Sequence, residues 1–261
     1  MSRWCDGAGG VYASPVSPEA LLALLGAFVI GLSKAGFATG LGMIVTPLLA
    51  AAMPARQAIG VLLPLLLAAD GLTLAVYWKR WDFSLVRTLL VGTVLGIAAG
   101  TFFVASISDR ALSFSIGIIG SILVILLIVR NVWFPGHAYR PPWPVGVAVG
   151  VAAGFSSTIA HAAGPIVALY LLAQRPPKEA FVATSGIFFA VNNALKVPPY
   201  VLSGLITPAT LRADVWYLPG VPLGVGAGWL IQRLIPQRRF DFVVYALLLV
   251  TSLHLIIANA P

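Results

Sequence analysis

Long apolar runs alternate with short polar connections, and ten such runs can be marked along the 261 residues. A helix that crosses a bilayer needs about 20 apolar residues, and most of the runs approach that length. The first, sixth and seventh are shorter, so we expect them either to start deep in the membrane or to fail to cross it. The pattern predicts an all-α integral membrane protein with about ten membrane helices. The runs are Ala20–Ser33, Phe37–Met53, Gln57–Tyr77, Thr88–Ile107, Ala111–Val129, Pro144–Thr158, Ala162–Ala173, Ala180–Leu202, Val215–Ile231 and Phe242–Asn259.

The second half of the chain repeats features of the first half. The segment "MPARQA", Met53–Ala58, aligns with "RPPKEA", Arg175–Ala180, at an offset of 122, which places Gly42 on Gly164. Further along, the offset becomes 128, and glycines four residues apart align on one helix face, as in close helix packing. These glycines are Gly92, Gly96 and Gly100 in the first half and Gly220, Gly224 and Gly228 in the second.

Each half contains five apolar runs, so the second half enters the membrane from the opposite side. The sequence therefore predicts two inverted-topology repeats of five helices, an architecture typical of secondary transporters. We expect a flexible lead over residues 1–18, a first repeat over 19–130, a cytoplasmic connection over 131–143 and a second repeat over 144–261.

Each repeat begins with a short or re-entrant, glycine-interrupted helix pair. The interruptions are "GLSKAGFATGLG", Gly31–Gly42, and "AGFSSTIAHAAGP", Ala153–Pro165. Backbone at membrane depth leaves the helix only where it is buried in protein or lines a wet cavity, and paired interruptions indicate a binding site. Helices that restart at about Thr39 and His161 would direct unpaired N–H groups and positive dipole ends to one place. This arrangement predicts an anion site near the membrane midplane.

The polar residues near these interruptions are mostly hydrogen-bond donors, as an anion site requires. Each also has another interpretation: Lys34 could reach the far interface, His161 could cap a helix or relay a proton, and Asn192 and Asn193 could join helices. The sequence "VPPY" after Lys196 could unwind the helix and let that lysine reach a surface. Asp70, the counterpart of Asn192, is a candidate for proton coupling or for pairing with a lysine. The candidate substrate-binding residues are Lys34, Gly36, Thr39, Gly40, Gly42, Ser156, Ser157, His161, Gly164, Asn192, Asn193 and Lys196.

Composition and charge support a membrane location. Hydrophobic residues make up 59% of the chain and charged residues 9%, with a net charge of +8. The connections after odd runs carry ten Lys or Arg residues, whereas the amino terminus and the connections after even runs carry four, so the charge marks a membrane side rather than nucleic-acid binding. The positive-inside rule makes the first group cytoplasmic and places both termini outside, in a multi-pass protein of the cell membrane. Cys5 is the only cysteine, so we expect no disulfide, no cysteine metal cluster and no cofactor.

Two stretches resemble a known family. They are "GLGMIVTPLL", Gly40–Leu49, and "AAGPIVALYLLAQRPPKEAFVATSGIFFAVNNALKVPPY", Ala162–Tyr200, with a Gly-Pro pair, Tyr-Leu-Leu, a basic loop, Phe-x-x-Thr and an Asn followed by Lys. Together with the paired hairpins they are similar to the sulfite exporter TauE/SafE family of membrane transporters, although Lys34 stands where many members have a small residue. The resemblance implies transport, often export, of a small sulfur-containing anion such as sulfite, thiosulfate or an organosulfonate.

The hypothesis is therefore a secondary transporter that exports such an anion by alternating access, with protons as a coupling ion left open. One alternative is an anion channel or a non-transporting membrane scaffold. Another is an intramembrane hydrolase, in which "GFSS", Gly154–Ser157, supplies a serine nucleophile and His254 its base. The stretch lacks the glycine that follows such a serine, and the metallopeptidase pattern H-E-x-x-H is absent from the sequence.

Overall fold

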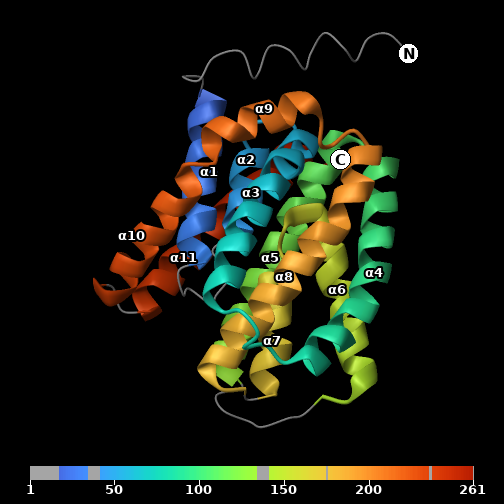
Figure 1. Ribbon diagram of the computed structural model, residues 1–261. Helices are drawn as coiled ribbons and strands as arrows, with labels where there is room; N and C mark the ends of the chain where they lie inside the picture. Colours follow the sequence, from blue (N-terminus) through green and yellow to red (C-terminus); the bar gives the residue numbers. More distant parts are fainter. Residues whose placement is uncertain (1–17, 35–41, 134–140, 175, 235–236, 261) are drawn as a thin grey trace.

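The computed structural model describes residues 18–34, 42–133, 141–174, 176–234 and 237–260. Within these ranges the regular structure is helical throughout, in agreement with the all-α expectation (Figure 1). In the described part of the chain, six helices are long and apolar enough to cross a membrane, namely α3, α4, α5, α6, α8 and α11. The helices are α1 Pro18–Lys34, α2 Gly42–Ala50, α3 Ala55–Val76, α4 Phe83–Ser106, α5 Asp109–Trp133, α6 Trp143–Ala160, α7 Gly164–Ala173, α8 Lys178–Leu202, α9 Pro208–Tyr217, α10 Gly220–Leu234 and α11 Gln237–Asn259.

Two helical hairpins enter the bundle from opposite ends. Figure 1 shows α1 descending from the end where α9 lies and α6 rising from the other end, with α2 and α7 as the short return arms. Helix α2 has 9 residues and α7 has 10, so they rise only about 14 and 15 Å. Because the hydrocarbon core is about 30 Å thick, neither return arm crosses it alone.

The expected ninth run, Val215–Ile231, is divided in the structure. Its first residues complete α9, a short helix that lies across one end of the bundle (Figure 1), and α10 begins only at Gly220. Helix α9 starts in a capping box in which the hydroxyl of Thr207 accepts the N–H of Thr210. Leu218 still has helical backbone angles, but Pro219 has no N–H with which to continue the hydrogen bonds of α9, so the two helices are separate. The apolar pattern alone did not reveal this boundary.

Ion pairs at the two ends of the bundle show which connections lie together. At one end Arg56, near the start of α3, pairs with Asp109 at the start of α5, with 3.0 Å between Nη1 and Oδ1. At the other end Arg80, between α3 and α4, pairs with Glu179 at the start of α8, with 3.1 Å between Nη1 and Oε2. The connection with Lys79 and Arg80 therefore lies at the same end as the α7–α8 connection, as the charge pattern predicted.

Glycines bring two pairs of helices into close backbone contact. A Cβ at Gly92 or Gly96 of α4 would overlap carbonyl oxygens of α6, and a Cβ at Gly150 or Gly154 of α6 would overlap carbonyl oxygens of α4. In the same way, a Cβ at Gly224 of α10 would overlap a carbonyl oxygen of α1. The close packing predicted from the four-residue glycine spacing is confirmed at Gly92, Gly96 and Gly224.

Candidate anion site

The break between α6 and α7 forms one side of the site. Helix α6 ends at Ala160, and His161 adopts the left-handed conformation, with φ 49° and ψ 33°. Its N–H donates to the carbonyl of Ser157 at 3.0 Å, which closes the helix as a C-cap. The second helix restarts at Gly164 and not at His161 as predicted, because Pro165 is accommodated only in the first turn of a helix.

The imidazole of His161 connects three parts of the molecule. Its Nε2 lies 2.9 Å from the carbonyl oxygen of Ile59 on α3. Its Nδ1 lies 2.9 Å from Nζ of Lys196 on α8. His161 is therefore both a helix cap and part of a buried polar network. Both contacts belong to the structural role that the sequence allowed for His161, and its contact with substrate stays a prediction.

Lys196 is completely buried. Its Nζ lies 3.2 Å from the carbonyl oxygen and 3.0 Å from the hydroxyl of Ser157, in addition to its contact with His161. Helix α8 continues through Pro198 and Pro199 to Leu202, so the unwinding that would carry this lysine to a surface does not occur. The carbonyl belongs to the last turn of α6, where the helix dipole favours a cation. Among the described residues, none of the ion pairs includes Lys196.

Asp70 of α3 lies at the centre of a second group. Its Oδ1 accepts from Nζ of Lys34 at 2.5 Å, and its Oδ2 accepts from Nδ2 of Asn193 at 2.6 Å. The Lys34 ammonium also lies 5.0 Å from the centre of the Phe189 ring, within the range of a cation–π contact. Lys34 therefore points into the bundle, where Asp70 neutralises its charge.

Two further candidates lie behind these groups. Asn192 donates to the hydroxyl of Ser157 at 2.7 Å, and its Oδ1 has no partner among the described residues. Ser156 is buried and its hydroxyl lies within hydrogen-bond distance of the carbonyls of Ala153 and Ala162, so it serves the end of α6. Gly36, Thr39 and Gly40 were also predicted to line the site, and they lie outside the described residues.

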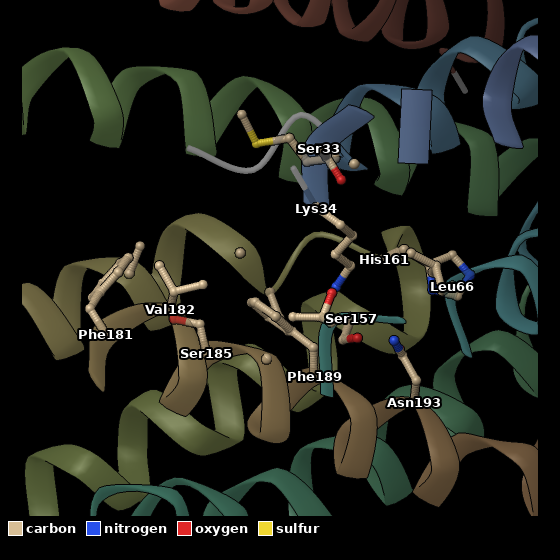
Figure 2. Close-up of a pocket in the computed structure, with 17 residues that line it drawn as sticks. Ser33, Lys34, Leu66, Ser157, His161, Phe181, Val182, Ser185, Phe189 and Asn193 are labelled. Atoms are coloured by element: carbon tan, nitrogen blue, oxygen red, sulfur yellow. The ribbon is translucent and has the colours of Figure 1, made fainter. Parts of the chain in front are cut away.

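A cavity of about 130 Å³ lies between the two hairpins and α8. Figure 2 shows Lys34 pointing from α1 toward Ser157, Phe189 and Asn193 on the opposite wall. Asp70, Asn192 and Lys196 support the wall from behind. The predicted residues that line the cavity are Lys34, Gly42, Ser157, His161, Gly164 and Asn193.

Sequence reasoning missed most of the α8 wall. Phe181, Ser185 and Phe189 line the cavity together with Asn193 (Figure 2). These residues are four positions apart, which places them on one helix face. That spacing is visible in the sequence, but the phenylalanines do not stand out from the apolar run around them. Thr73 of α3 also lines the cavity and was not predicted.

The charges of this region favour an anion. Lys34 and Asp70 neutralise each other, which leaves the ammonium of Lys196 as the uncompensated charge among the described side chains of the network. Gly42 and Gly164, the first residues of α2 and α7, both line the cavity, and helix N-termini carry partial positive charge. Fold and site together define a helical membrane protein with an internal cavity suited to a small anion.

The sequence matches the family described as "Sulfite exporter TauE/SafE" over residues 23–255, and the chain belongs to this family. It is therefore a multi-pass membrane transporter and not an enzyme, which removes the intramembrane hydrolase. In agreement, His254 is exposed on α11, whereas the Ser157 hydroxyl accepts from Asn192 and Lys196. Comparisons with curated proteins and with solved structures found no match.

Proposed function

We propose that the protein is a secondary transporter that exports a small sulfur-containing anion of the sulfite, thiosulfate or organosulfonate class across the cytoplasmic membrane. The observation that carries this proposal is the fully buried Nζ of Lys196, which forms no ion pair among the described residues. Ser157 and His161, which contact this ammonium, form part of the cavity wall. Because burying an uncompensated charge is expensive by several kcal/mol, an anion in the cavity stabilises the site.

Alternating access between two inverted repeats is the mechanism we propose. The two hairpins enter from opposite ends, and α4 packs on α6 through glycines as α10 packs on α1. Pro54 and Pro177 are the N-caps of α3 and α8, an offset of 177 − 54 = 123, which is one more than the offset of 122 expected from the sequence that paired Asp70 with Asn192. The same offset relates Asp70 to Asn193, which hydrogen bond to each other. Equivalent residues in direct contact are expected at a pseudo-two-fold axis through the site.

The position of the cavity supports an inward-facing state. The α8 residues that line it run from Phe181 to Asn193, on the half of α8 nearer the end that carries Arg80. On the other side of Lys196, Tyr200 is fully buried and its hydroxyl donates to the carbonyl of Thr158 at 2.6 Å. If the basic end is cytoplasmic, as the positive-inside rule requires, the site faces the cytoplasm and the outer side is closed.

Flux measurements in proteoliposomes test this proposal. We expect uptake or efflux of radiolabelled thiosulfate or sulfite against its gradient when a membrane potential or proton gradient is imposed. Lys196→Gln should reduce transport by about 10- to 100-fold, since hydrogen bonds to a charged group contribute about 1.5–3 kcal/mol. Arg87→Gln, which removes the same charge from an exposed position of α4, is the matched control. Flux that only runs downhill would indicate a channel, and absence of flux would indicate a scaffold.

A further inference from the structure

The contacts of His161 define where its proton lies. The carbonyl oxygen of Ile59, 2.9 Å from Nε2, can only accept a hydrogen bond, so Nε2 carries a hydrogen. Nδ1 faces the Lys196 ammonium at 2.9 Å and accepts from it. The imidazole is therefore neutral, and the pair of His161 and Lys196 carries one positive charge. A second proton on Nδ1 would place two cations in contact.

The other polar groups around His161 do not balance a second charge. From α8, Tyr200 presents its ring, and its hydroxyl is engaged with a backbone carbonyl. From α3 and α1, Asp70 and Lys34 form a neutral pair. Without a ligand, the network of described side chains therefore carries a net charge of about one positive unit. A bound monoanion makes this site neutral, whereas a dianion leaves one negative charge in excess.

We propose that His161 takes up one proton when a dianion binds and none when a monoanion binds, so that the occupied site is electrically neutral in both cases. This inference rests on the proposed function. The proton comes from the water of the cavity, which His161 lines, and binds Nδ1. The contact with Lys196 is then broken, and Nδ1–H becomes a donor for the anion. A dianion crosses with one proton, in the same direction.

Asp70, the proton-coupling candidate of the sequence, is less suited to this step. Its two oxygens accept from the ammonium of Lys34 and from the amide of Asn193, at 2.5 and 2.6 Å. Both partners donate through these atoms and stabilise the ionised carboxylate, so a proton on Asp70 would weaken both hydrogen bonds and leave the charge of Lys34 uncompensated. Protonation of His161 at Nδ1 breaks only its contact with Lys196, and these two groups compete for positive charge.

Calorimetric titration of the purified protein in two buffers with different ionisation enthalpies tests the inference. The probes are thiosulfate, a dianion, and methanesulfonate, a monoanion, because neither takes up a proton itself near neutral pH. We expect uptake of about one proton per thiosulfate and none per methanesulfonate. Thiosulfate affinity should rise as the pH falls, by up to about tenfold for each pH unit, and methanesulfonate affinity should stay constant over the same range.

His161→Gln is the decisive variant, because glutamine can accept from Lys196 and donate to the carbonyl of Ile59 but cannot bind the proton. It should retain methanesulfonate binding and lose both the proton uptake and the pH dependence of thiosulfate binding. His254→Gln, the same change at an exposed position, should behave as the wild type. If His161→Gln does not fold, wild-type protein labelled with ¹⁵N only at its three histidines reports protonation of Nδ1 directly.

The outcomes separate the inference from the proposed function. Wild-type protein that binds neither anion would contradict the proposed function. Binding of thiosulfate without proton uptake, or uptake that persists in His161→Gln, would overturn the inference and leave the function intact. Equal uptake with both anions would overturn it as well, since charge balance then does not set the proton number.

Discussion

At the residue scale, Lys34 and Asp70 set the charge of the site. Their atoms are 2.5 Å apart, and the side chains are only 15% and 1% exposed. Removing one partner of a buried pair leaves the other charge uncompensated. Because the pair borders the cavity, the remaining charge either attracts or repels an anion, which makes the sign of its effect on binding predictable.

We expect Asp70→Asn and Lys34→Met to shift anion affinity in opposite directions. Asp70→Asn leaves a free ammonium and should strengthen thiosulfate binding, and Lys34→Met leaves a free carboxylate and should weaken it. Each change should amount to about 10- to 100-fold, the effect of one charge several ångströms away in a partly screened site. The double variant should return close to wild-type affinity, as measured by calorimetry. Weaker binding by Asp70→Asn would show instead that the carboxylate itself assists the anion.

Asp214 is a buried acid outside the six spanning helices. It lies on α9, is 5% exposed, and neither of its carboxylate oxygens has a hydrogen-bond partner among the described residues. Burial raises the pKa of this carboxyl from 3.8 to about 8. A folded-state pKa above the unfolded value means that stability is present in full at low pH and is lost as the pH rises toward about 8.

We therefore expect Asp214→Asn to be more stable than the wild type at alkaline pH. The difference should be on the order of 1–3 kcal/mol at about pH 9 and should shrink toward about pH 5, where the wild-type acid is neutral. Thermal unfolding in detergent across this range measures the effect. A difference that does not change with pH would contradict burial of a neutral acid.

At the scale of helices, glycines serve two distinct purposes. A Cβ at Gly42, which lines the cavity, would meet only the hydroxyl of Ser33 at 3.7 Å, an ordinary contact. A Cβ at Gly150, on α6, would overlap the carbonyl oxygen of Leu89 on α4. The first glycine leaves space at the site, and the second allows two backbones to approach each other.

Alanine substitutions should separate these purposes. Gly42→Ala should remain folded and monodisperse in detergent and should lose transport, because the methyl group narrows the cavity. Gly150→Ala should lower the thermal stability by about 1–3 kcal/mol, the usual effect of overpacking. Size-exclusion profiles, melting curves and flux assays distinguish the two. If Gly42→Ala transports normally, the anion does not pass close to the start of α2.

At the scale of the whole molecule, the α3–α4 and α7–α8 connections lie together at one end of the bundle. Arg80 pairs there with Glu179, and Arg212 lies on α9 at the opposite end. The positive-inside rule assigns the first end to the cytoplasm. Both the inward-facing assignment and the direction of export depend on this orientation.

Cysteine labelling in cells tests the orientation. In a Cys5→Ser background, Arg212→Cys should react with an impermeant thiol reagent from outside, since its position on α9 is exposed. Lys79→Cys, also exposed, should react only after the membrane is permeabilised. The reverse labelling pattern would show that the protein has the opposite orientation in the membrane and that the cavity faces outward.

The sequence by itself determined that the chain folds in a lipid bilayer and is helical. It also determined the family resemblance and the residue types of the site. Long apolar runs with few charges are stable in lipid as helices, because a helix satisfies its own backbone hydrogen bonds. Glycine interruptions beside donors such as Lys34 and His161 indicate polar backbone at membrane depth. It did not reveal α9, whose few apolar residues merged with those of α10, or the α8 wall, where Phe189 reads as part of an apolar run.

Only the tertiary structure decided which polar groups are partners. Helical periodicity tells which residues share a face, but not which helix that face meets. Asp70 contacts both Lys34 and Asn193, 36 and 123 positions away in the chain. Lys196 of α8 contacts Ser157 and His161 of the α6–α7 hairpin. These pairings set the charge of the site, because a lysine beside a carboxylate is neutralised whereas a lysine beside a neutral imidazole is not. They depend on how close packing brings distant helices together, and the local pattern of a single chain does not contain that information.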